Sequence, residues 1–98
     1  MQKIKSKQEI KKRKAEFSIY SADAKEVYLM GSFNNWNPRK HPMHQNHMGM
    51  WEKTVIIPPG IYEYKFLVDG QWKIDPQNCL TCMNSFGSKN SVLDFPRK

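Results

Sequence analysis

The feature that most constrains the fold of this chain is the dipeptide Asp69-Gly70, which separates two runs of alternating apolar and polar residues, 64–68 and 71–74. Successive side chains of a β-strand point to opposite faces, so this alternation predicts two strands. An Asp-Gly pair supplies the two positive-φ positions that let a two-residue turn match the twist of its strands. We therefore predict an antiparallel hairpin centred on residues 69–70.

The same alternation predicts strands at residues 15–19 and 27–29, and it extends the strand before Asp69 to residues 62–68. A run rich in β-branched residues predicts another strand at 50–57, and a last one is expected at 91–95, before Pro96. Groups of Ser, Asn, Asp, Pro and Gly separate these runs, and we expect them to form hairpin turns. These turns lie at residues 21–24, 34–38, 58–60 and 75–76. The pattern predicts an all-β fold, an immunoglobulin-like β-sandwich of about seven short antiparallel strands.

The length of 98 residues allows one hydrophobic core and therefore one domain. We assign residues 14–98 to the β-sandwich and residues 1–13 to a basic, flexible N-terminal extension. Residues 1–16 contain seven Lys or Arg against two Glu, so most of the net charge of +7 lies in this segment. Such an extension is typical of a solvated arm, although it can also attract nucleic acid or an anionic membrane.

The sequence gives three indications of the compartment. Apolar runs such as residues 55–57 are far shorter than the roughly 20 residues that span a bilayer. No apolar stretch resembling a secretory signal follows Met1, so we expect a cytoplasmic protein. Cys79 and Cys82 are too few for a disulfide scaffold and have the spacing of half a zinc site, but no second Cys pair follows.

No catalytic motif is present in the sequence. There is no Gly-x-Ser-x-Gly, no glycine-rich phosphate loop and no His-Glu-x-x-His. Asp69 and Asp75 resemble a carboxylate pair, but turn chemistry before Gly70 and Pro76 accounts for both. We predict that the protein is not an enzyme and that it needs no cofactor.

Three histidines, His41, His44 and His47, recur at every third position. On a helix they would share one face and suggest a metal site. Pro42 and Gly49 argue against a helix, so we expect a polar loop and no bound metal. A site shared between these histidines and the two cysteines is the remaining alternative.

The tryptophans are the most informative side chains. Trp36 lies in an Asn-rich turn segment, and Trp72 follows the turn at residues 69–70, so neither position is required in the core. Trp51 opens the apolar strand at 50–57 and is expected to be a core residue. An exposed indole flanked by amides suits a sugar, with its apolar faces and hydroxyl edges, and it also suits a stacked base.

Three segments carry a resemblance to a known family: residues 26–37 (EVYLMGSFNNWN), 59–72 (PGIYEYKFLVDGQW) and 75–76. Together they resemble carbohydrate-binding module family 48. This family includes the glycogen-binding domain of the AMP-activated protein kinase β subunit and the N-terminal domains of isoamylases and branching enzymes. The resemblance covers residues 15–95, and it implies non-catalytic binding of α-1,4-linked glucan, that is, glycogen, starch or maltooligosaccharides.

The resemblance also implies the residues of the sugar site. Trp36 and Trp72 match the two tryptophans that stack on glucose rings, and Lys65 matches the lysine that hydrogen-bonds sugar hydroxyls. The segment 84–90 (NSFGSKN) matches the binding loop of the family. In this loop Asn90 is the hydrogen-bonding asparagine, Ser88 is a small hydroxyl residue, and Phe86 replaces a leucine that contacts the sugar chain. Residues 79–83 depart from the family.

Two other classes of function remain open. Some members of the family serve as docking domains, so the chain can be a scaffold for a glycogen-metabolising enzyme or a kinase-type partner. A nucleic-acid binder that uses the basic extension is the second alternative, and its affinity would fall steeply with salt.

Overall fold

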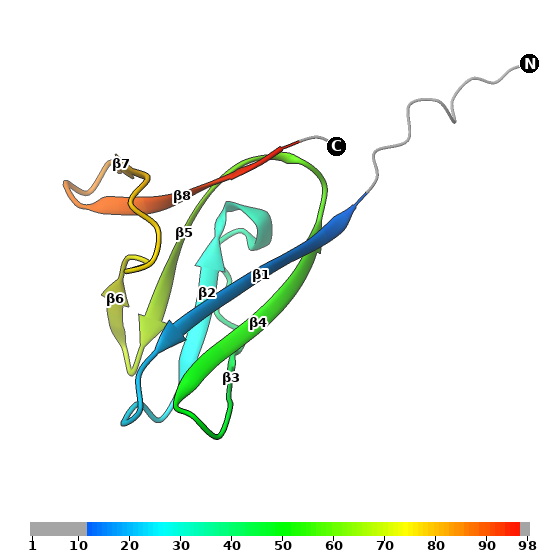
Figure 1. Cartoon of the computed structure of the whole chain (residues 1–98). Coiled ribbons are helices and arrows are strands. Elements are labelled where there is room, and N and C mark those ends of the chain that lie inside the picture. Colours follow the sequence, from blue (N-terminus) through cyan, green and yellow to red (C-terminus); the bar gives the residue numbers. More distant parts are fainter. Residues whose placement is uncertain (1–11, 97–98) are drawn as a thin grey trace, which may run out of the picture.

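The computed structural model describes residues 12–96, which form a sandwich of two antiparallel sheets (Figure 1). The strands are β1 (Arg13–Tyr20), β2 (Val27–Gly31), β3 (His44–Gln45), β4 (Met50–Ile57), β5 (Gly60–Val68), β6 (Gln71–Lys73), β7 (Thr81–Met83) and β8 (Lys89–Phe95). A 3-10 helix, η2 (Ser32–Asn34), follows β2. The predicted all-β sandwich is confirmed.

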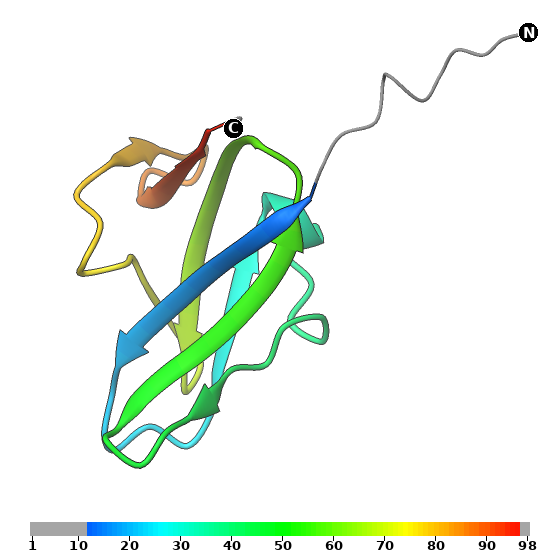
Figure 2. The same ribbon diagram turned by 45° about the vertical axis from the view of Figure 1, so that its right-hand side comes forward.

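The two sheets differ in size (Figure 2). The smaller has the strand order β1-β4-β3, and the larger has the order β2-β5-β8-β7, with β6 pairing β5. The two edges of β5 pair with different strands. One edge pairs with β2, whereas the other pairs with β8 through residues 60–64 and with β6 through residues 66–68. Lys65 therefore lies where the partner strand of β5 changes.

The core lies between the sheets and follows the predicted alternation. Phe66 and Leu29 are fully buried, and Trp51 is only 7% exposed, with its indole Nε1 donating to the Ser21 carbonyl at 2.8 Å. The prediction that Trp51 is a core residue is confirmed. The other large members of the core are Phe17, Ile19, Val27, Met43, Val55, Ile57, Tyr64 and Val68.

The hairpin at residues 69–70 is confirmed. Asp69 and Gly70 have φ of 48° and 83°, and Val68 pairs with Gln71 directly across the turn. The Asp69 carboxylate accepts hydrogen bonds at 2.9 Å from the backbone N–H groups of Lys25 and Glu26. It thereby fixes the end of the hairpin to the segment that enters β2.

The other four turns were expected to form hairpins, and this expectation is wrong. Residues 21–24, 34–38 and 58–60 connect strands of different sheets, and residues 75–76 lead from β6 to β7, which do not pair with each other. Turn residues make the chain change direction, but they do not determine which strand the next strand pairs with. That choice depends on burial of the apolar faces between the sheets.

Two hairpins appear that the alternation did not predict. β3 pairs with β4 across a turn containing Gly49, and β7 pairs with β8 across a turn containing Gly87; both glycines have positive φ. β3 places His44 in a strand rather than a loop, and β7 lies within the segment 79–83 that departs from the family. Both strands are too short to show alternation, and no Asp-Gly pair marks their turns as it does for β6.

The segment between β6 and β7 is anchored by Asp75, which is 8% exposed. Its Oδ1 accepts from the Gln77 backbone N–H at 2.9 Å, as the turn prediction requires. Its Oδ2 also accepts from the Tyr64 hydroxyl at 2.6 Å, and its backbone N–H donates to Ser91 Oγ at 2.8 Å. Asp75 thus ties this crossing segment to both β5 and β8.

The first described strand starts at Arg13, one residue before the predicted start of the domain. Residues 1–11 of the predicted extension lie outside the described residues. Within residues 12–96, no helix has the length and apolar character needed to cross a membrane.

Candidate functional site

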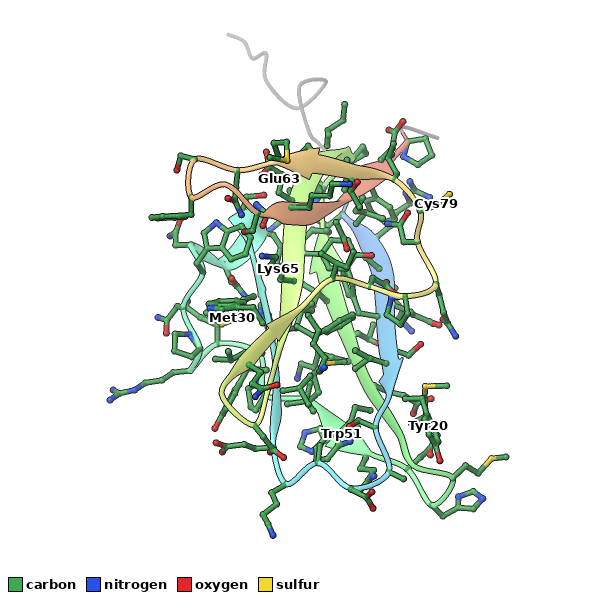
Figure 3. The ribbon with its side chains drawn as sticks, turned by 90° about the vertical axis from the view of Figure 1, so that its left-hand side faces the viewer. Tyr20, Met30, Trp51, Glu63, Lys65 and Cys79 are labelled. Atoms are coloured by element: carbon green, nitrogen blue, oxygen red, sulfur yellow. The ribbon has the colours of Figure 1, made fainter. Side chains whose placement is uncertain are left out.

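A groove of about 770 Å³ brings together all six residues of the predicted sugar site. Lys65 contributes from β5, and its neighbours Tyr64 and Phe66 point into the core, so Lys65 faces away from it. Figure 3 shows Lys65 beside Met30, its cross-strand partner on β2. The six predicted residues in the groove are Trp36, Lys65, Trp72, Phe86, Ser88 and Asn90.

The indoles of Trp36 and Trp72 meet edge to face, with ring centroids 6.4 Å apart and an interplanar angle of 70°. Trp72 stands on β6 and is 51% exposed. Trp36 is half-buried, rather than exposed as predicted from its turn position, and its contact with Trp72 contributes to that burial. The two rings form an angled aromatic wall along the groove.

Asn34 holds the turn that presents Trp36, and it is only 5% exposed. Its Oδ1 accepts from the backbone N–H groups of Gly31 at 3.0 Å and Trp36 at 3.1 Å. Its Nδ2 donates to the Leu29 carbonyl at 3.0 Å and lies 2.8 Å from His41 Nδ1. Because Nδ2 is a donor, His41 Nδ1 acts as an acceptor in this arrangement.

Strain in the backbone accompanies this presentation of Trp36. Asn35 and Trp36 both have φ of 57°, in the left-handed region that a bulky side chain rarely adopts. Two consecutive residues of this kind persist only where surrounding contacts hold them. The four contacts of the Asn34 amide supply that hold.

Lys65 is 9% exposed, so most of its side chain is covered. Its ammonium Nζ donates to Ser88 Oγ at 3.2 Å and lies 5.9 Å from the centroid of the Trp72 ring. This second contact is at the outer range of a cation–π interaction. The ammonium is therefore directed into the groove, beside the aromatic wall.

The loop between β7 and β8 is organised by one side chain, Asn84. Its Oδ1 accepts from the backbone N–H groups of Phe86 at 2.9 Å and Ser88 at 3.1 Å. Its Nδ2 donates to Ser88 Oγ at 2.8 Å and to Asn90 Oδ1 at 3.0 Å. These bonds hold Phe86 at the tip of the loop, where its ring is 92% exposed.

A carboxylate completes the polar side of the groove. Asn90 Nδ2 donates to Glu63 Oε1 at 2.8 Å, while Cys82 on β7 pairs directly opposite Asn90. Partial burial, followed by a hydrogen bond to Glu63, raises the pKa of the Cys82 thiol. Hydrogen bonds thus link the polar groups in one chain: Lys65, Ser88, Asn84, Asn90 and Glu63.

This arrangement suits a ligand with apolar faces and hydroxyl edges. The indoles and the Phe86 ring offer flat apolar surface, and the ammonium and amides offer hydrogen-bond donors and acceptors. Among the described residues, Glu63 is the one carboxylate that lines the groove, and it is bonded to Asn90. Hydrolysis of a glycosidic bond generally uses two carboxyl groups that flank it.

The two cysteines are free thiols, with Cys79 exposed and Cys82 partly buried. Within residues 12–96, no three or more His, Cys, Asp or Glu side chains gather in a way that could hold a metal ion. His41 is directed instead toward Asn34, as described above.

Comparison with known proteins identifies the family to which the chain belongs. Residues 7–98 match the family model of the glycogen recognition site of AMP-activated protein kinase. The chain belongs to this family. The glycogen recognition site family accounts for nearly all of the sequence, including every segment that carries the resemblance to carbohydrate-binding module family 48.

Proteins from animals and plants are similar in sequence to this chain. The chain is 37% identical over 78 residues to "5'-AMP-activated protein kinase subunit beta-1" of Sus scrofa, covering 80% of this chain and 61% of the relative. It is 36% identical to the Homo sapiens protein of the same name, covering 27% of it. It is 37% identical over 75 residues to "Protein PTST homolog 2, chloroplastic" of Arabidopsis thaliana, covering 76% of this chain and 14% of that protein. The chain therefore spans less than two thirds of these relatives.

Four further residues of the groove had no predicted role, although two of them lie in the predicted binding loop, residues 84–90. Met30, Glu63, Asn84 and Ser85 line the groove together with the six predicted ones. Alternation along β5 carries a signal for Glu63, because residues 63 and 65 share one face of a strand. No sequence pattern indicates the role of Asn84, because its hydrogen bonds depend on the conformation of the β7–β8 loop.

Proposed function

We propose that this protein binds α-1,4-linked glucan chains of glycogen or starch and does not cleave them. The observation that supports this most strongly is the convergence of Trp36, Lys65, Trp72, Phe86, Ser88 and Asn90 on one groove. These residues come from three separate parts of the sequence. Membership in the glycogen recognition site family supports the same ligand.

In this proposal, each part of the groove recognises a different part of the sugar. The apolar faces of glucose units rest on Trp36, Trp72 and the exposed ring of Phe86, which removes apolar surface from water. Lys65 and Asn90 form hydrogen bonds to hydroxyl groups in place of water. A shallow groove of this kind binds weakly, with Kd on the order of micromolar to millimolar, and glycogen strengthens binding by offering many chains.

Calorimetric titration with maltoheptaose tests the proposal, with a β-1,4-linked glucose oligomer of the same length as the matched control. We expect saturable binding of maltoheptaose and much weaker binding of the control, because the linkage changes the curvature presented to the angled indoles. Equal affinity for both oligomers, or no affinity for either, contradicts the proposal.

The non-catalytic part of the proposal has its own assay. No increase in reducing ends is expected when the protein is incubated with maltoheptaose. Release above the buffer rate that is abolished by Glu63→Gln contradicts this part. Salt dependence separates the sugar from a nucleic acid, since binding of a neutral glucan changes little with ionic strength.

A second candidate function is that of a targeting module that brings a protein partner to glucan. It is supported by relatives named as subunits of a kinase, which extend well beyond the matched segment. A Trp72→Ala variant separates the two roles, because it should lose glucan while keeping a partner that docks elsewhere. We also propose that glucan binding takes place in the cytoplasm. Co-fractionation of the protein with cytoplasmic glycogen particles tests this location.

A further inference from the structure

A second hollow, of about 550 Å³, adjoins the groove on the other side of β6. Trp72 lines both spaces, so this residue lies between them. In Figure 3, Lys65 and Met30 lie on one side of the β6 ribbon and Tyr20 lies on the other. The hollow is therefore within reach of a linear ligand that leaves the groove past Trp72.

The hollow lies between two strand edges that belong to different sheets. β1 is the outer strand of the smaller sheet, and within residues 12–96 β6 pairs with β5 alone. The end of β1 contributes Tyr20 and Ser21, and the segment after Trp72 contributes Lys73, Ile74 and Pro76. Strand edges expose backbone N–H and C=O groups, which can hydrogen-bond to a ligand.

The lining of the hollow has the same chemical character as the groove. Tyr20 is 63% exposed, Trp72 51% and Ile74 39%, so apolar surface is available on both sides. Lys73 is the one charged side chain among the described lining residues, and the Ser21 hydroxyl is a further polar group. Apolar surface with a few donors suits a neutral, hydroxyl-rich ligand better than a charged one.

We propose that a glucan chain bound in the groove continues across Trp72 into this hollow. The inference rests on the proposed function and extends it to chain length. A long linear chain then contacts Tyr20 and Ile74 in addition to the groove, whereas a short or cyclic chain ends at Trp72. The protein accordingly favours long unbranched chains over short ones.

Two ligands and four variants test this extension. The ligands are a linear α-1,4-linked decasaccharide and a cyclic α-1,4-linked heptasaccharide, which has no free end to extend. The variants Tyr20→Ala and Ile74→Asp alter the hollow and leave the groove intact. Ile56→Asp is the matched control, because Ile56 is 61% exposed on β4 and lines neither space. If Ile74→Asp does not fold by circular dichroism, Lys73→Ala replaces it.

Each hollow variant should bind the decasaccharide about five- to tenfold more weakly and the cyclic ligand within about twofold of wild type, for a loss of about 50 Å² of apolar contact. Ile56→Asp should bind both ligands normally. If the hollow variants lose affinity for both ligands equally, or for neither, the extension is wrong. The hollow would then bind a different ligand, such as an extended peptide. Failure of the wild-type protein to bind either ligand overturns the proposed function itself.

Discussion

The indole of Trp36 lies edge to face against that of Trp72, with centroids 6.4 Å apart, although the two residues come from different connections of the sandwich. Trp36 belongs to the turn after β2, and Trp72 stands on β6 just beyond the hairpin at residues 69–70. Neither ring contributes to the core cluster. The two rings are therefore available to a ligand. Removal of either ring should change the stability of the fold little.

Trp36→Ala and Trp72→Ala should each weaken maltoheptaose binding while the melting temperature stays close to wild type. If one face of an indole covers about 80 Å² of sugar, its loss corresponds to about 2 kcal/mol, or roughly thirtyfold in affinity. Trp51→Ala is the control. That ring is 7% exposed, so its removal should cost about 3 to 5 kcal/mol of stability.

Calorimetry and thermal melts on the three tryptophan variants must divide them into two classes. A Trp36→Ala protein that melts far below wild type and still binds maltoheptaose contradicts the assignment of Trp36 to the site.

Asn84→Ala should weaken glucan binding about tenfold, because the bonds that order the loop around Phe86 and Ser88 are lost. Asn46→Ala is a matched control. Asn46 Oδ1 accepts from the backbone N–H groups of Met48 and Met50 in the β3–β4 turn, in the same manner but away from the groove. Titration with maltoheptaose should show a loss for Asn84→Ala alone, and an equal loss in both variants would rule out the ordering role.

Stability should fall as the pH is lowered below about 6.5, the ordinary pKa of histidine, because of His41. Burial, with the nearby charges of Lys53 and Lys40, lowers the pKa of His41 in the folded protein. The folded state then binds fewer protons than the unfolded state between the two pKa values. The contribution of neutral His41 is present above the unfolded pKa and is lost as the pH falls through the folded one.

Protonation also removes the acceptor at His41 Nδ1 that faces Asn34 Nδ2, so the Trp36 turn should loosen over the same range. His41→Gln should reduce the pH dependence of the melting temperature between pH 7.5 and pH 5, and His47→Gln, at an exposed position, should not. Identical pH profiles for wild type and His41→Gln would exclude this residue as the cause.

Asp75→Ala should cost about 2 to 3 kcal/mol of stability, since it removes the acceptor of a buried hydroxyl. Burial and the hydrogen bond to Asp75 raise the pKa of Tyr64, which keeps that hydroxyl protonated as a donor. Asp94→Ala, at an exposed position on β8, should change stability by less than about 0.5 kcal/mol. Denaturant unfolding measures both, and similar values would show that the Tyr64 contact contributes nothing.

The sequence alone determined the longer strands and the residue types of the site. Alternation predicted β1 and β5, because alternate side chains of each strand point into the core. The Asp69-Gly70 pair set its own hairpin, because the geometry of a two-residue turn depends on those two residues. The family resemblance pointed to six residues, and all six lie in one groove.

Only the tertiary structure decided how strands far apart in sequence lie beside one another. The change of partner along β5 places Lys65 in the groove, and closure of the β7–β8 loop links Asn84 to Asn90 and Glu63. Asn34 beneath Trp36, and the hollow between β1 and β6, likewise depend on the packing of one sheet against the other. These features arise from burial of apolar surface between distant segments, which no local pattern of residues encodes.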